Sequence, residues 1–168
     1  REVTRSGKYT HLEYARFADD VVILIDGHQK WDWLVQAVNQ RLQEELTKLD
    51  VEINRDKTKI VDLAKGETFS FLGFDFRQKI TLKGKKAASY TPTIKARTVL
   101  TRKIKDTFKR SRSQPIKGVI EEINPILRGW TNYFRIGNSS RQFGYIRDWV
   151  ERKVRRHLMR SRKRKGFG

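Results

Sequence analysis

The chain has 168 residues, of which 37% are hydrophobic and 34% are charged, and it contains no cysteine. This length permits one ordinary domain, or two small ones, each with its own core. The lack of cysteine excludes disulfides, cysteine–zinc sites and thiol nucleophiles, and it fits a reducing compartment. The apolar run Val21–Ile25 is too short to span a bilayer, and no secretory signal is present, so neither secretion nor membrane insertion is expected. Because the first residue is Arg1 rather than Met, we expect a piece of a longer protein.

The first part of the chain is predicted to be mostly β. Strands are predicted at residues 11–17, 21–25, 57–63, 69–76 and 78–84, the first two around a turn at Ala18–Asp20. A helix is predicted at residues 30–49, where Leu34, Val38 and Leu42 recur at helical spacing. One helix among strands in this order indicates an antiparallel α+β sheet rather than a parallel one.

The second part is predicted to be helical. Residues 83–93 read as a linker, and helices are expected at residues 94–112, 116–136 and 140–161. The second helix is expected to be broken or restarted by Pro125. The predicted fold class is therefore α+β, with a partial antiparallel sheet and a packed helix in residues 1–90 and an all-α domain with a basic tail in residues 91–168.

The net charge of +19 lies almost entirely in the second part. Residues 94–168 hold 22 Lys and Arg against 5 Asp and Glu, whereas residues 1–93 hold 16 against 14. A polyanion is the expected partner, because each neutralised phosphate releases counterions. An anionic membrane surface and a merely basic soluble domain are the competing interpretations. Aromatic residues typical of a folded core argue against the membrane: Trp130, Tyr133, Phe134, Phe143, Tyr145 and Trp149.

Two adjacent carboxylates, Asp19 and Asp20, interrupt the apolar stretch "YARFADDVVILIDG". Charged groups are costly in such a place unless a partner compensates them. Magnesium prefers hard oxygen ligands and usually takes one or two carboxylates from protein. A pair of such ions can activate a hydroxyl group and stabilise a leaving pyrophosphate. From these two residues alone, an acidic turn on a surface hairpin remains the alternative.

Four segments, in this order, resemble the group II intron-encoded reverse transcriptases. "YARFADDVVILI" resembles the palm signature, with Phe17 where the family usually has Tyr. "LDVEINRDKTKIV" (residues 49–61) is similar to the next palm element, and "FSFLGFDF" (residues 69–76) resembles the primer-grip strand. "INPILRGWTNYFR" (residues 123–135) is similar to the signature of the maturase-specific, thumb-like domain. The chain thus resembles the C-terminal half of a palm followed by a thumb/maturase domain.

The resemblance implies roles for individual residues. Asp19 and Asp20 would be two of three metal-binding aspartates, and Lys57 would protonate the leaving pyrophosphate, unless it is an ordinary surface lysine. The primer grip would contain Phe71, Leu72 and Gly73, for which core packing and a bulge glycine are the alternatives. Nucleic-acid contacts would come from Arg128, Gly129, Trp130, Tyr133, Arg135, Arg141 and Arg147. Core packing is the alternative for Trp130 and Tyr133.

The function implied is that of an RNA-directed DNA polymerase, a nucleotidyltransferase, which also binds group II intron RNA to promote splicing and intron mobility. Its partners would be intron RNA, template RNA, a DNA primer and dNTP, with two Mg²⁺ ions. The third carboxylate and the fingers are expected from outside this chain, which by itself should not polymerise. The alternatives are an RNA-binding maturase without polymerase activity, or a reverse transcriptase of a CRISPR-associated or diversity-generating lineage. A cytoplasmic location, bacterial or organellar, is expected.

Overall fold

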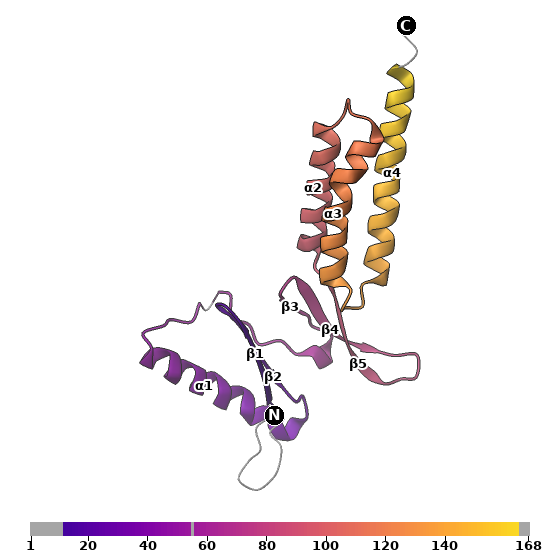
Figure 1. Cartoon of the computed structure of the whole chain (residues 1–168). Helices are drawn as coiled ribbons and strands as arrows, with labels where there is room; N and C mark the ends of the chain where they lie inside the picture. The colour runs from indigo at the N-terminus through magenta and orange to yellow at the C-terminus, as the bar shows by residue number, and fades with distance from the viewer. Residues whose placement is uncertain (1–11, 55, 165–168) are drawn as a thin grey trace. The chain divides into compact units, whose positions relative to one another are not determined.

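The computed structural model describes residues 12–54 and 56–164 (Figure 1). The chain divides into two compact units, Arg1–Phe71 and Leu72–Gly168. Helices combine with two small antiparallel sheets, so the predicted α+β class is confirmed at this level. The predicted boundary between residues 90 and 91 concerns domain identity and stays a prediction.

The first unit opens with an antiparallel hairpin. Strand β1 (Leu12–Phe17) pairs with β2 (Asp20–Ile25), in a register that runs from Leu12 opposite Ile25 to Phe17 opposite Asp20. Ala18 and Asp19 form the two-residue turn, and Ala18 has a φ of 51°. Positive φ is typical of the tight turns that join paired strands, because their twist matches that of the strands. The predicted hairpin is therefore confirmed.

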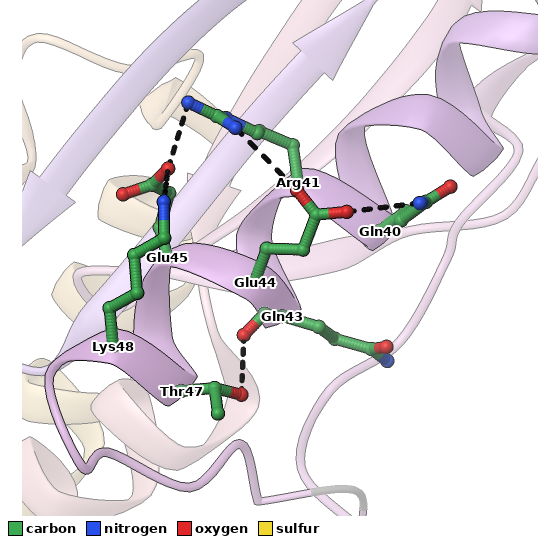
Figure 2. A network of polar contacts seen from close by, with 7 residues as sticks. All are labelled: Gln40, Arg41, Gln43, Glu44, Glu45, Thr47 and Lys48. Atoms are coloured by element: carbon green, nitrogen blue, oxygen red, sulfur yellow. Dashed lines mark hydrogen bonds and ion pairs between the residues drawn. The ribbon is translucent and has the colours of Figure 1, made fainter.

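Helix α1 (Asp32–Lys48) follows a short 3₁₀ helix, η1 (Gln29–Trp31), close to its predicted place. One face carries a polar network (Figure 2), in which Glu45 Oε1 lies 2.8 Å from Arg41 Nη2 and 2.9 Å from Lys48 Nζ. The hydrogen bond from Lys48 and the nearby Arg41 charge lower the pKa of Glu45. Such exposed pairs contribute little to the free energy of unfolding, so this network adds little to the stability of the helix.

The first unit buries few of its apolar side chains. Among its described hydrophobic residues, Leu34 alone is buried, while Tyr14 and Phe17 are 60% and 61% exposed. An open groove of about 760 Å³ is lined by hairpin residues such as Leu12 and by Val38 of α1. The helix therefore lines a groove with the hairpin rather than sealing a core against it.

The strand predicted at residues 57–63 is wrong. The segment is a turn and an irregular stretch that ends in a second 3₁₀ helix, η2 (Leu63–Lys65). The Lys57 backbone N–H donates to the Asn54 carbonyl at 3.2 Å and to the Asn54 side chain at 3.1 Å. Because local turn bonds use the backbone donors here, apolar alternation alone does not produce a strand.

A second sheet has the order β3-β4-β5, with β3 (Phe69–Phe71), β4 (Phe74–Ile80) and β5 (Lys86–Pro92). Three predictions made from the sequence are wrong in this region. The single strand predicted over residues 69–76 is two strands separated by Leu72 and Gly73, and the linker predicted at residues 83–93 is mostly β5. The return strand predicted at 78–84 is the end of β4 plus a turn.

The residues of strand β5 alternate roughly in burial, even though its beginning is rich in lysine. Its buried residues include Ser89 and Thr91, and the pairing with β4 runs from Phe74 opposite Pro92 to Ile80 opposite Lys86. Small polar residues carry a weak hydrophobic signal, so the strand was hidden from the sequence pattern. Pairing with β4 supplies the partner that an isolated segment lacks.

The second unit continues with three helices that lie side by side in Figure 1: α2 (Ile94–Arg110), α3 (Ile116–Phe134) and α4 (Ser140–Arg164). All three predicted helices are confirmed. Thr93 caps α2 by accepting the Ala96 N–H at 3.0 Å. Pro125 lies inside α3 without ending it, so the predicted break is absent. The bundle core consists of Leu100, Ile104, Val119, Ile123 and Ile146.

In the part of the chain that the structure describes, every helix is too short or too polar to cross a bilayer.

Candidate metal-binding hairpin and nucleic-acid interface

Asp19 and Asp20 lie at the tip of the β1–β2 hairpin, and both are exposed. Asp19 is in the turn and Asp20 is the first residue of β2, opposite Phe17. The turn is braced by Arg16, whose Nε donates to the Ala18 carbonyl oxygen at 2.9 Å. The hairpin therefore presents two carboxylates to solvent from a backbone held on both sides.

These two side chains fit a magnesium ion by their chemistry. They are hard oxygen donors, they are accessible, and one or two carboxylates suffice when water and phosphate fill the remaining positions. Within residues 12–54 and 56–164, no group of three or more His, Asp or Glu side chains is arranged to hold a metal ion. The resemblance implies a third carboxylate from outside this chain, and this stays a prediction.

Lys57 lies exposed in the turn after α1 and belongs to the same unit as the hairpin. The turn is organised by Asn54, whose carbonyl accepts from the Thr58 backbone N–H at 3.0 Å and from its hydroxyl at 2.9 Å. The Asn54-x-x-Lys57-Thr58 pattern therefore builds a compact turn that presents the Lys57 side chain to solvent. Its role towards pyrophosphate stays a prediction.

The predicted primer-grip residues form the end of β3 and the turn before β4. Phe71 is half-buried, and Leu72 and Gly73 have φ values of 50° and 78°. Two consecutive left-handed residues are the signature of a type I′ hairpin turn. A bulge glycine, the alternative left open by the sequence, is replaced here by a glycine in a hairpin turn.

Two aromatic residues of the "RGWTNYF" segment, Trp130 and Tyr133, have different surroundings. Trp130 is half-buried against the bundle core, and its ring centroid lies 4.9 Å from that of Phe134 and 5.6 Å from that of Phe143. Tyr133 is 52% exposed, and its hydroxyl donates to the Leu72 carbonyl at 2.9 Å. The ring of Trp130 is thus used for packing, and the polar end of Tyr133 for holding a turn.

The predicted phosphate-binding arginines are all exposed in this unit. Arg128 is on α3, Arg135 follows its last residue, and Arg141 and Arg147 are on α4. Arg147 Nε also lies 3.2 Å from Asp148 Oδ1. Gly129, in α3, has open space around it, since a Cβ there would meet no atom within 4 Å. The five residues are spread over α3, its C-terminal end and α4.

A denser group of cations lies on α2 and α4, and the sequence analysis did not single it out. Lys153, Arg156 and Arg160 follow one another at helical spacing on α4, and Lys105 of α2 is close enough to repel Lys153. The spacing of the α4 residues could have been read from the sequence, whereas the approach of Lys105 depends on how the helices pack. We call Lys105, Lys153, Arg156 and Arg160 the α2–α4 basic cluster.

The surroundings of Lys153 show that the positive charges of this cluster repel one another. Its Nζ lies 5.1 Å from the centre of the Trp149 ring, so the ammonium group is held over an aromatic face. Partial burial lowers the pKa of Lys153, and repulsion by Arg156, Lys105 and Arg160 lowers it further. An anion placed here would relieve the repulsion, which is the property expected of a phosphate site.

A comparison with known protein families gives a match that lies within the second unit. The family model described as the group II intron, maturase-specific domain matches residues 97–168, which include almost all of α2 and the whole of α3 and α4. No curated protein matches the chain. Over residues 97–168 the chain is therefore similar to the maturase-specific domain of group II introns.

Proposed function

We propose that residues 97–168 bind group II intron RNA and so promote its splicing and mobility. The observation that carries this proposal is the α2–α4 basic cluster on a domain of the maturase-specific family. Helices α2 and α4 hold most of the positive charge, whereas α3 carries Lys117 and Arg128 against Glu121 and Glu122. The neutral, apolar α3 supports the core, and the two basic helices present cations to the RNA backbone.

Binding alone can account for a role in splicing. A preformed bundle that neutralises phosphates from different parts of an RNA lowers the repulsion between them, and the released counterions favour the complex. The bundle core, with Ile104 fully buried and Ile123 nearly so, keeps the cations in place during binding. The protein would then stabilise the active fold of the intron, while the RNA supplies the splicing chemistry.

The test is a comparison of two variants with equal charge loss. The first replaces the four α2–α4 cluster residues by Gln, and the second replaces four exposed lysines of the β4–β5 hairpin: Lys79, Lys83, Lys85 and Lys86. Affinity for intron RNA is measured at several salt concentrations. We expect the cluster variant to lose roughly 0.7 to 0.9 of salt slope for each phosphate contact removed, and the hairpin variant to lose much less. Equal losses in the two variants would contradict the proposal.

We further propose that the complete protein is an RNA-directed DNA polymerase in which Asp19 and Asp20 hold Mg²⁺. Their exposure at a braced hairpin tip, together with the resemblance of four segments to reverse transcriptases, supports this proposal. When bound, Mg²⁺ would lower the pKa of the primer hydroxyl and stabilise the leaving pyrophosphate. Asp19 and Asp20 would hold the metal, and Lys57 would supply a proton to the leaving group.

Replacing Asp19 and Asp20 together by Asn in the complete protein tests this second role. We expect complete loss of Mg²⁺-dependent cDNA synthesis with intron RNA affinity unchanged, because Asn removes both negative charges at nearly constant size. Unchanged cDNA synthesis would contradict the metal assignment. A complete wild-type protein that binds intron RNA but makes no cDNA would instead support the alternative of a maturase without polymerase activity.

The maturase-specific match supports the intron class over the CRISPR-associated and diversity-generating lineages. Adding an unrelated structured RNA of equal length to the binding experiment separates these lineages. Only an intron maturase should prefer folded group II intron RNA.

A further inference from the structure

The turn between β3 and β4 holds a residue in an unfavourable conformation. Leu72 has a φ of 50°, in the left-handed region that side chains with a Cβ rarely adopt. Gly73, with a φ of 78°, adopts the same region without cost. Leu72 is 37% exposed, so burial of its side chain does not explain why the chain accepts this conformation. Such positions persist where surrounding contacts hold them, and they cluster at functional sites.

The contacts that hold this turn come from the helical bundle. The Tyr133 hydroxyl donates to the Leu72 carbonyl at 2.9 Å, and the Thr93 N–H donates to the Gly73 carbonyl at 2.9 Å. The Phe134 ring lies close beneath, 3.5 Å from where a Cβ on Gly73 would be. Both turn carbonyls are therefore bonded to residues at the ends of helices, which fixes their direction.

The corner between α3 and α4 is itself tied to the sheet. Asn138 exchanges two hydrogen bonds with the Tyr90 backbone, at 2.8 Å and 3.1 Å. The Tyr133 ring stacks on Phe74 with 5.8 Å between ring centroids, and the Phe134 ring meets Phe74 edge-on at 4.8 Å. The end of α3 thus cannot move relative to β4 without breaking several contacts at once.

We propose that Tyr133 is a positioning residue that sets the conformation of the Leu72–Gly73 turn. In this way the maturase-specific domain, which includes Tyr133, would aim the segment proposed as the primer grip, which lies before the matched residues. The functional consequence rests on the proposed polymerase role. The hydrogen bond between Tyr133 and Leu72 does not depend on that role, because it is a property of the folded second unit.

This role differs from base stacking in its response to one substitution. Tyr133→Phe keeps an aromatic face, so a stacking role would survive it. The same change removes the hydroxyl that bonds Leu72, so a positioning role would not. Tyr145→Phe is the matched control, since Tyr145 belongs to the same unit, is 50% exposed and faces Arg97 through its ring.

The first measurement uses NMR on the full 168-residue chain. For Tyr133→Phe we expect a shift of the Leu72 carbonyl carbon resonance and about three- to tenfold faster hydrogen exchange at the Thr93 amide, as loss of one hydrogen bond implies. Tyr145→Phe should change neither. An unshifted Leu72 resonance in Tyr133→Phe, or equal changes in both variants, would overturn the positioning role.

The second measurement uses the complete polymerase and separates this proposal from the primer-grip assignment. If both are right, Tyr133→Phe raises the KM for primer–template several-fold with little change in kcat, and Tyr145→Phe does not. A shifted Leu72 resonance with an unchanged KM would support the positioning of the turn and overturn its role as primer grip. An unchanged resonance would overturn the positioning role whatever the kinetics.

Discussion

Lys153 shows how the folded bundle changes the chemistry of a single residue. Burial and three neighbouring cations lower its pKa, so folding disfavours its charged form. Below the folded pKa the protonated group opposes folding, and stability rises as the pH increases from the folded pKa towards the unfolded one. A bound phosphate should reverse this effect by favouring the protonated form.

The effect of Lys105 on the pKa of Lys153 can be tested by substitution. Lys105→Met removes one of the charges that repel Lys153, so we expect the pKa of Lys153 to rise. The measurement is an NMR titration of the Lys153 side-chain Cε. Lys109→Met, which removes an equal charge from the same helix, is the control and should leave the pKa of Lys153 where it is. An equal rise in both variants would contradict the cluster.

Substitution by Ala is expected to change the free energy of unfolding in opposite directions at two glycines, Gly137 and Gly129. A Cβ on Gly137 would lie 2.7 Å from the Tyr90 carbonyl oxygen, so Gly137→Ala should lower the free energy of unfolding by roughly 1–3 kcal/mol. A Cβ on Gly129 would meet nothing within 4 Å, and Ala is favoured over Gly in a helix, so Gly129→Ala should raise it by up to about 1 kcal/mol.

Denaturant unfolding measures both glycine variants, and intron RNA binding adds a functional readout for Gly129. If RNA approaches α3 at Gly129, the stabilised Gly129→Ala variant should bind more weakly. If its affinity is unchanged, the proposed role of Gly129 as a point of close approach is wrong.

At the scale of elements, the beginning of α2 depends on Thr93. Its side chain accepts the Ala96 N–H at 3.0 Å, which satisfies a donor that the helix itself leaves free. Thr93→Ala should therefore lower the free energy of unfolding by about 1 kcal/mol. Thr101→Ala, within the same helix, is the control for loss of a threonine side chain and should have a smaller effect. Thermal or denaturant unfolding of the two variants is the measurement.

The elements also show which sequence signals were sufficient. The three helices of the second unit were predicted to within a few residues, because each has an apolar stripe and a clear start. The strand predicted at residues 57–63 failed because Asn54 captures the backbone in a turn. Strand β5 was missed because Ser89 and Thr91 are buried without being hydrophobic. In both cases the hydrogen-bond partners of the backbone, rather than intrinsic strand propensity, decided the structure.

For the whole molecule, the two units differ in how much core they possess. Among the described residues of the first unit, Leu34 is the single buried hydrophobic residue. The second unit contains a core cluster of five buried residues. A two-stranded hairpin is only marginally stable by itself. We therefore expect the β1–β2 amides, such as that of Ile23, to exchange with solvent at least about tenfold faster than the Ile104 amide.

Native-state hydrogen exchange on the full chain measures this difference. Equal protection of Ile23 and Ile104 would show that the two units unfold as one, and the expected hierarchy of stability would be wrong. Addition of RNA should protect the second unit further, because a ligand that binds the folded bundle stabilises it by mass action.

The sequence by itself determined the α+β class, the hairpin that presents Asp19 and Asp20, the three helices and the basic character of the second part. These features depend on local periodicity, turn residues and composition, which any reader of the sequence can recover. Only the tertiary structure decided that Lys105 approaches Lys153, and that the Tyr133 hydroxyl bonds Leu72, a residue 61 positions away along the chain. Contacts between distant residues depend on helix packing and on partner strands, and no local pattern in the sequence encodes them.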